Sequence, residues 1–335
     1  MKLNQLTSTR FIAAILIVFY HFGRETYTHF YEPIQLLINK ANLGVSYFFI
    51  LSGFVMILAY SEKNIDFKQY YLNRLARIYP SYLLALSLVV GYLLARHSTV
   101  DITAFILGVL GIQAWFPQYA TSLNFTGWSL AVELFFYALF PFLLKHVYQR
   151  YALNKVLFAI AVIWIMSQAY FHYLLFYPSS ILSSNFIYFF PVMHLSSFLL
   201  GNGTGLLYLT IKRQEVSSHR FIILGLILLL YYILDTPISL DFHNGLLALI
   251  YVPILLFISL EPKPFRLLNS KILVFLGEIS YGIYIYQYPI YLFTPAILRR
   301  LGLEMSFGGY LLILLTFCTL NYWFIETRLR KLLLQ

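Results

Sequence analysis

Long apolar runs, separated by short polar segments, recur along the whole chain. A helix that crosses a lipid bilayer needs about 20 mostly apolar residues, and many of these runs approach that length. We expect about ten of them to cross a membrane as helices. Their ranges are 8–24, 43–60, 81–96, 126–144, 156–175, 187–209, 221–235, 243–260, 272–292 and 308–324. The pattern therefore predicts an all-α, polytopic membrane helix bundle.

One further apolar run, at residues 102–116, is short for a membrane span. Basic residues gather in the short segments between the other runs, as they do in cytoplasmic loops. These basic segments can share one side of the membrane only if the chain crosses once between residues 97 and 144. We therefore predict that 102–116 is an interfacial or re-entrant helix, and that both chain termini are cytoplasmic.

The composition supports a membrane protein and excludes several other classes. The 335 residues are 60% hydrophobic and only 11% charged, whereas a soluble domain carries about 25% charged residues. No long polar linker divides the chain, so we expect a single membrane domain over residues 1–335 without an appended soluble domain. The net charge of +10 reflects mainly the basic loops, so we expect no nucleic-acid partner. A single cysteine, Cys318, excludes an intramolecular disulfide, and no residue cluster has metal-ligand spacing.

Arg10 and His21 are the first candidates for chemistry. A spacing of 11 residues is close to three whole turns of an α-helix and about 16 Å of rise, so both side chains share one face. Ionisable groups inside an apolar span are costly and usually functional. A neutral imidazole there could take a proton from a hydroxyl nucleophile. The alternative is a histidine that hydrogen-bonds across the bundle and serves packing alone.

Glu133 and a pair of arginines are the next candidates. Glu133 lies inside an apolar run, four residues after Ser129, and needs a partner. It could orient the His21 imidazole, or it could pair structurally with an arginine or tyrosine. Arg74 and Arg77, three residues apart, suit phosphate recognition at a membrane surface, with anchoring as the alternative.

Polar side chains within two other runs indicate helices that line or border a cavity. The run 272–292 contains Ser280, Tyr281, Tyr284 and Gln287, which favours a cavity-lining helix. The small residues of the run 43–60, which are Gly44, Ser46, Ser52 and Gly53, favour close helix packing instead. Three histidines inside or beside other runs are ambiguous from their pattern: His172, His194 and His243.

Several segments in order resemble the acyltransferase-3 family, which comprises mostly bacterial membrane enzymes that O-acetylate surface polysaccharides. These segments are Leu6–Arg10, Tyr20–Phe22, Gly44–Val45, Leu51–Phe54, Arg74–Pro80, Trp128–Leu130 with Glu133, and Ile279–Gly282. The resemblance runs from Leu6 to about Arg330. It implies acetyl-CoA as a cytoplasmic donor, with no permanently bound cofactor, and a carbohydrate hydroxyl as acceptor.

The resemblance also assigns roles to residues. Arg10, His21 and Glu133 match catalytic positions of the family, while Arg10, Arg74 and Arg77 would hold the phosphates of the donor. The substrate cavity would be lined by Trp128, Ser129, Ser280, Tyr281, Tyr284 and Gln287.

Two positions depart from the family pattern. Relatives often carry histidine where Gln287 stands, and a Pro-Glu pair where this chain has Ser196-Ser197. Both could tune the acceptor.

The sequence thus predicts an acetyl-CoA-dependent O-acetyltransferase of the bacterial inner membrane. Its expected acceptor is lipopolysaccharide O-antigen or a related lipid-linked glycan, and a homodimer is left open. Two other functions remain as alternatives. One is a polysaccharide or acyl-group transporter or flippase that uses Arg10 and His21 as a relay. The other is a scaffold subunit of a polysaccharide synthase, in which these residues are replaceable.

Overall fold

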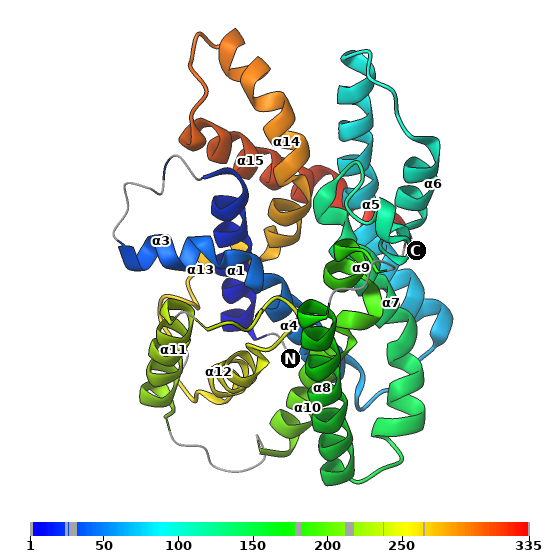
Figure 1. Cartoon of the computed structure of the whole chain (residues 1–335), viewed down its shortest axis with the longest axis vertical. Helices are drawn as coiled ribbons and strands as arrows, with labels where there is room; N and C mark the ends of the chain where they lie inside the picture. Colours follow the sequence, from blue (N-terminus) through cyan, green and yellow to red (C-terminus); the bar gives the residue numbers. More distant parts are fainter. Residues whose placement is uncertain are drawn as a thin grey trace.

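The computed structural model describes residues 3–23, 26, 32–177, 182–211, 218–236, 238–263 and 265–333. These residues form a bundle of helices, and no strand occurs among them (Figure 1). The all-α prediction is therefore confirmed.

Six helical stretches are long and apolar enough to cross a membrane: Asn4–Phe22, Ala41–Tyr60, Phe67–Ala95, Phe125–Tyr148, Leu153–Phe176 and Phe307–Leu329. They contain α1 (Asn4–Phe22), α4 (Gly44–Tyr60), α5 (Phe67–Ala95), α7 (Trp128–Leu143), α8 (Leu153–Phe176) and α15 (Phe307–Asn321). Each stretch overlaps one of the predicted spans. The chain is a multi-pass membrane protein.

The other predicted spans form shorter or divided helices. These are α10 (Leu195–Ile211), α11 (Arg220–Asp235) and α12 (Ala248–Leu260), together with α13 (Lys271–Glu278) and α14 (Ser280–Arg300), which divide the run 272–292. Close packing accompanies this division, because a Cβ on Gly277 would meet the Thr7 carbonyl of α1. The Ser280 hydroxyl donates to the Gly277 carbonyl at 2.7 Å. The ten-span topology stays a prediction.

The run 102–116 forms α6 (Ile102–Leu110) and a short 3₁₀ turn, Gln113–Trp115, and a second such turn, Pro117–Tyr119, follows it. The Asp101 carboxylate caps its start by accepting from the Thr103 and Ala104 amides, and the helix ends at Gly111 with φ 67°. Nine residues rise about 14 Å, less than half the thickness of a bilayer core. The run is thus a short helix, as predicted, and its place relative to the membrane stays a prediction. The remaining α-helices are α3 (Glu32–Asn39), α9 (Ser184–Phe189) and α16 (Thr327–Leu333).

Helix α5 begins well before the predicted span at 81–96. The Asp66 side chain caps it by accepting from the Gln69 amide at 3.2 Å, and Pro80 is accommodated inside the helix. The extra turns carry Arg74 and Arg77 on a rigid helix. Both side chains therefore project from the same side of the helix, about 4.5 Å apart along its axis.

Helices α4 and α10 cross at close range. A Cβ on Gly53 would collide with the Phe198 carbonyl, and one on Gly201 would collide with the Ile50 carbonyl. Glycine at both positions lets the two backbones meet directly. The packing role predicted for Gly53 agrees with this contact, which fixes α4 in the bundle.

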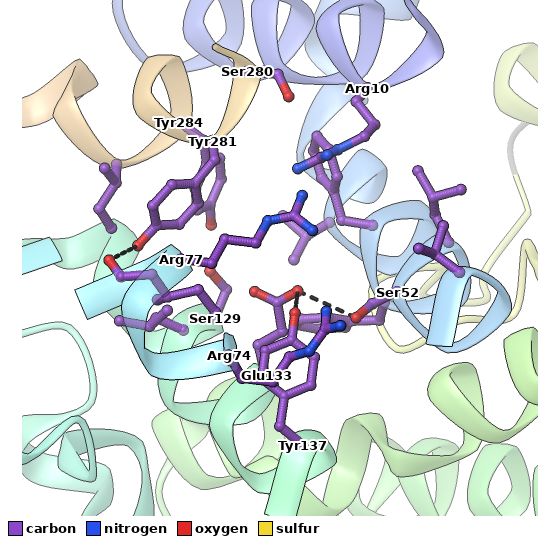
Figure 2. Close-up of a pocket in the computed structure, with 18 of the residues that line it drawn as sticks. Arg10, Ser52, Arg74, Arg77, Ser129, Glu133, Tyr137, Ser280, Tyr281 and Tyr284 are labelled. Carbon is purple, nitrogen blue, oxygen red and sulfur yellow. Dashed lines mark hydrogen bonds between the residues drawn. The ribbon is translucent and has the colours of Figure 1, made fainter. Parts of the chain in front are cut away.

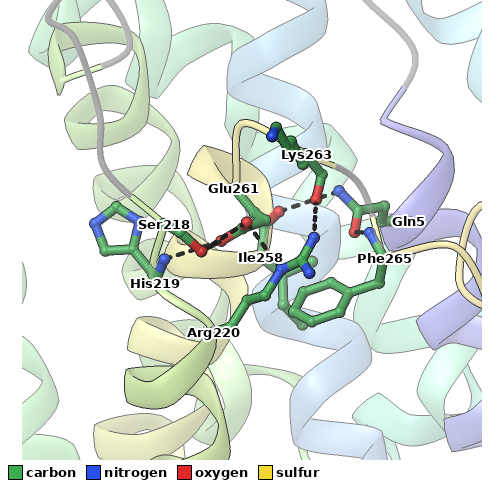
Figure 3. Close-up of polar contacts among 8 residues, drawn as sticks. All are labelled: Gln5, Ser218, His219, Arg220, Ile258, Glu261, Lys263 and Phe265. Carbon is green, nitrogen blue, oxygen red and sulfur yellow. Dashed lines mark hydrogen bonds and ion pairs between the residues drawn. The ribbon is translucent and has the colours of Figure 1, made fainter.

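A buried carboxylate ties the start of α11 to the end of α12, and Gln5 of α1 bonds to Ile258 and Phe265 beside it (Figure 3). Glu261, directly after α12, accepts hydrogen bonds from the Ser218 hydroxyl at 3.0 Å and the His219 amide at 2.9 Å. The Arg220 Nε forms an ion pair with it at 3.2 Å, and Arg220 also donates to the Lys263 carbonyl. Burial alone would raise the pKa of Glu261, but these hydrogen bonds and the arginine charge together lower it.

Acid should therefore weaken this network. Because the folded-state pKa of Glu261 is depressed, its contribution to stability is complete above the unfolded-state value of about 4.3 and is lost as pH falls through the folded value. We expect Glu261→Gln to lower the thermal unfolding midpoint, Tm, at neutral pH. Tryptophan fluorescence of the purified protein should show the Tm difference from wild type shrinking as pH falls below about 4.3. The exposed Glu304→Gln is the control, and a pH-independent difference for Glu261→Gln would contradict the prediction.

Candidate functional site

A cavity of about 110 Å³ with several charged and polar side chains in a largely apolar wall lies where α1, α4, α5, α7 and α14 meet, and we call it the arginine cavity (Figure 2). Its polar lining consists of Arg10, Ser52, Arg74, Arg77, Ser129, Glu133, Tyr137, Ser280, Tyr281 and Tyr284. The cavity therefore gathers residues from five helices that are far apart in the sequence.

Glu133 is the carboxylate of this cavity. It accepts a hydrogen bond from the Tyr137 hydroxyl at 2.6 Å and one from the Ser52 hydroxyl at 3.2 Å. Tyr137 follows Glu133 by four residues on α7, so the two side chains share a helix face. These two donors hold the carboxylate in place.

Arg74 is held by tyrosines. Its Nη2 donates to the Tyr60 hydroxyl at 2.7 Å. Its guanidinium carbon lies 5.1 Å from the ring centroid of Tyr60, 5.6 Å from that of Tyr137 and 5.9 Å from that of Tyr70. These distances are within the range of cation–π attraction. Arg74 is therefore fixed by its aromatic surroundings.

Arg10 and Arg77 differ from Arg74, because neither guanidinium group forms a hydrogen bond or ion pair with any residue that the structure describes. Figure 2 shows the Arg77 guanidinium between Arg10 and Glu133. Three guanidinium groups thus face one carboxylate, a surplus of two positive charges. Cations in such an enclosed site are costly without a counter-ion. The arrangement suits a polyanion with several phosphate oxygens.

A second cavity, of about 180 Å³, contains His21, and we call it the histidine cavity. Its lining includes Tyr20, Asn42, Thr121, Phe125, Trp128 and His243. The Phe125 ring packs edge-on against the His21 ring, with centroids 4.9 Å apart. The cavity combines aromatic walls with a few polar groups, as small-molecule sites commonly do.

Gln287 determines which nitrogen of His21 carries the proton. The Gln287 amide nitrogen donates to the Tyr284 carbonyl at 2.8 Å, so its oxygen is the atom 2.8 Å from His21 Nδ1. An amide oxygen only accepts, and Nδ1 must therefore be the donor. Neutral His21 then has its lone pair on Nε2, the nitrogen that can act as a base.

Arg10 and His21 share α1 as predicted, but each lines a different cavity. The two cavities have two wall residues in common, Val45 and Tyr284. The helix face that Arg10 and His21 share therefore borders two adjoining cavities, with Val45 and Tyr284 in the wall between them. A helix separation of about 16 Å is large enough for two compartments in sequence along α1.

The predicted site residues are distributed over the arginine cavity and the histidine cavity. Eight of the predicted residues line the arginine cavity: Arg10, Arg74, Arg77, Ser129, Glu133, Ser280, Tyr281 and Tyr284. Trp128 lines the histidine cavity, and Gln287 is fully buried beside His21.

The structure does not place Glu133 against the imidazole. Trp128 at the start of α7 faces the histidine cavity, and Glu133 follows five residues later. Five residues turn a helix by about 500° and advance it about 7.5 Å, so Glu133 points to another side at another depth. The orienting partner of His21 is Gln287, whereas the sequence pattern suggests Glu133 for that contact.

Several residues of the site are not assigned to it by the sequence pattern. The pattern assigns Ser52 to helix packing, but its hydroxyl donates a hydrogen bond to Glu133. Tyr60 accepts a hydrogen bond from Arg74, and Tyr137 donates one to Glu133. The spacing of Glu133 and Tyr137 carries a signal, because residues four apart on a helix are neighbours. The contacts of Tyr60 and the place of His243 depend on the packing of helices far apart in the sequence, so no local pattern announces them.

Comparison with known proteins assigns this chain to a family. The model of an acyltransferase domain, that of the acyltransferase-3 family, matches residues 3–326. Among curated proteins, "Putative acetyltransferase ORF330" of Acidianus two-tailed virus is 26% identical over 306 residues, which cover 91% of this chain and 88% of that protein. "O-acetyltransferase OatA" of Staphylococcus aureus is 22% identical over an alignment that covers 97% of this chain. The chain spans 57% of the length of OatA. No solved structure matches the chain significantly. With the family model covering nearly its whole length, the chain belongs to the acyltransferase-3 family of membrane acyltransferases.

Proposed function

We propose that this protein transfers an acetyl group from acetyl-CoA to a hydroxyl group of a cell-surface glycan at the bacterial inner membrane. The acceptor that we propose is a lipid-linked polysaccharide such as lipopolysaccharide O-antigen. The observation that carries the proposal is the surplus of positive charge in the arginine cavity, next to a cavity that contains a histidine with a defined tautomer. The first suits the phosphates of CoA, and the second suits deprotonation of a hydroxyl.

The donor enters the arginine cavity from the cytoplasm in this proposal. Arg10 and Arg77 bind phosphate oxygens of CoA, and Arg74 adds positive charge from its tyrosine cage. Ser52 and Tyr137 hold the Glu133 carboxylate in position. Its negative charge then offsets part of the positive charge of the three arginines. The flexible arm of CoA then carries the thioester past Val45 and Tyr284, the residues shared by the two cavities.

His21 performs the proton transfer. Its Nε2 takes the proton of the acceptor hydroxyl while the oxygen attacks the thioester carbonyl. The tetrahedral intermediate collapses, the carbon–sulfur bond breaks, and the CoA thiolate takes the proton from the imidazolium. Gln287 stabilises the imidazolium through its oxygen at Nδ1. The same nitrogen, Nε2, could instead attack the thioester and form an acyl-imidazole that the hydroxyl then resolves.

Turnover of radiolabelled acetyl-CoA by purified protein in nanodiscs tests the proposal. We expect free CoA to appear together with label in a glycolipid fraction extracted from the envelope of the host, and the label should require that fraction. A transporter or flippase would leave the thioester intact. A scaffold subunit would do the same, so an intact thioester under all conditions would refute the proposal.

A further inference from the structure

The three histidines without an assigned role converge beside the histidine cavity. The ring centroids of His194 and His243 are 6.0 Å apart. His172 is linked to the same region through Gln168, whose carbonyl lies 2.9 Å from His172 Nδ1 and whose amide donates to the Asn244 carbonyl at 2.8 Å. Of the three, His243 lines the cavity that also contains His21.

This region is rich in buried polar atoms that have no hydrogen-bond partner. Eleven such side-chain atoms occur among the described residues, and seven of them belong to Gln168, His172, His194, Ser197, His243 and Asn244. Ser197 and Asn244 are 0% exposed, and His194 is 1% exposed. A buried polar group without a partner is costly, and native proteins contain few of them. They mark a polar region behind the cavity wall, and of these six residues it is His243 that lines the cavity.

His243 is held in the cavity wall through its backbone. Its amide donates to the Asp241 carboxylate at 2.7 Å, and its carbonyl accepts from the Ser46 hydroxyl at 2.7 Å. Its ring packs edge-on against Tyr188 at 5.2 Å between centroids and lies 6.0 Å from the Trp128 ring. The ring position is therefore fixed by this packing and by the two backbone hydrogen bonds.

We propose that His243 binds a second hydroxyl of the acceptor while His21 acts on the hydroxyl that is acylated. A hydroxyl both donates and accepts, so it can pair with a ring nitrogen of His243 in either tautomer. The aromatic walls formed by Phe125 and Trp128 suit the apolar faces of a sugar ring. Both features fit the glycan acceptor of the proposed function. This inference rests on the proposed acetyl transfer.

Steady-state kinetics of His243→Phe tests the inference. Phenylalanine keeps the aromatic packing and both backbone hydrogen bonds but lacks the ring nitrogens. In nanodiscs with acetyl-CoA and the host glycolipid extract, we expect the KM for the extract to rise about tenfold. The KM for acetyl-CoA should stay within about twofold of wild type, because His243 lies outside the arginine cavity in which we place the donor phosphates. His243→Gln, whose amide can donate or accept, should recover part of the lost affinity.

His172→Phe is the matched control, because it removes the same ring nitrogens from a histidine that is not part of the cavity lining. Its KM for the extract should stay close to wild type. An unchanged KM for His243→Phe, or an equal rise for His172→Phe, would overturn the role of His243 alone. A wild-type protein that releases no CoA and labels no glycolipid would instead overturn the acetyl transfer on which the inference rests.

Discussion

Replacing His21 with alanine is expected to lower acetyl transfer by about 10²–10⁴-fold, the usual contribution of a general base. The physical reason is the tautomer set by Gln287, which leaves the Nε2 lone pair as the proton acceptor. The measurement is label transfer from acetyl-CoA to the glycolipid extract, per molecule of folded protein. The KM for acetyl-CoA should change little, because His21 lies outside the arginine cavity.

Two companion measurements separate catalysis from packing. Added imidazole should restore part of the activity of His21→Ala, since it can enter the space left in the histidine cavity. Gln287→Leu, which has similar volume but no amide, should lower kcat with little effect on the amount of folded protein. Transfer at the wild-type rate by folded His21→Ala would end the catalytic assignment.

Replacing both Arg10 and Arg77 with glutamine is expected to raise the KM for acetyl-CoA by about 10²–10⁴-fold. Each hydrogen bond from a charged donor to a phosphate contributes about 1.5–3 kcal/mol, or about 10- to 100-fold in affinity. Both guanidinium groups lack protein partners among the described residues, so their hydrogen-bonding capacity remains for the ligand. Binding of acetyl-CoA to protein in nanodiscs, measured by calorimetry at fixed salt, checks the prediction directly.

The controls for this prediction distinguish charge from geometry. Arg77→Lys keeps the charge and loses the planar fork, so it should weaken binding less than Arg77→Gln does. Arg96→Gln removes an exposed cation from the other end of α5 and should leave acetyl-CoA binding unchanged. Unaltered affinity in the Arg10→Gln, Arg77→Gln double variant would show that the phosphates bind elsewhere.

The partition between the two cavities gives the proposed reaction its order. Arg10 and His21 act on the same molecule only if the acetyl group passes Val45 and Tyr284. Tyr284 also contributes the carbonyl that orients Gln287, and Gln287 in turn orients His21. The residue at the partition is therefore linked to the tautomer of the base. Passage of the donor and readiness of the base can depend on one segment of α14.

Much of the architecture is predictable from the sequence because it depends on local chemistry. Apolar runs long enough to cross a bilayer specify helices, since every backbone polar group in lipid must bond within its own segment. Ionisable residues within such runs are too costly to be incidental, so the residue pattern alone singles out Arg10, His21 and Glu133. The shortness of α6 is readable from the length of its apolar run.

Which of these residues meet is decided only by the tertiary structure. Helix periodicity places Arg10 and His21 on one face, yet the Val45 and Tyr284 side chains from α4 and α14 divide that face into two cavities. Glu133 joins the arginines and Gln287 joins His21 because helix crossings, such as that of Gly53 and Gly201, set the rotation and depth of each helix. Such crossings depend on pairs of residues far apart in the chain, and a single sequence contains no local signal for them.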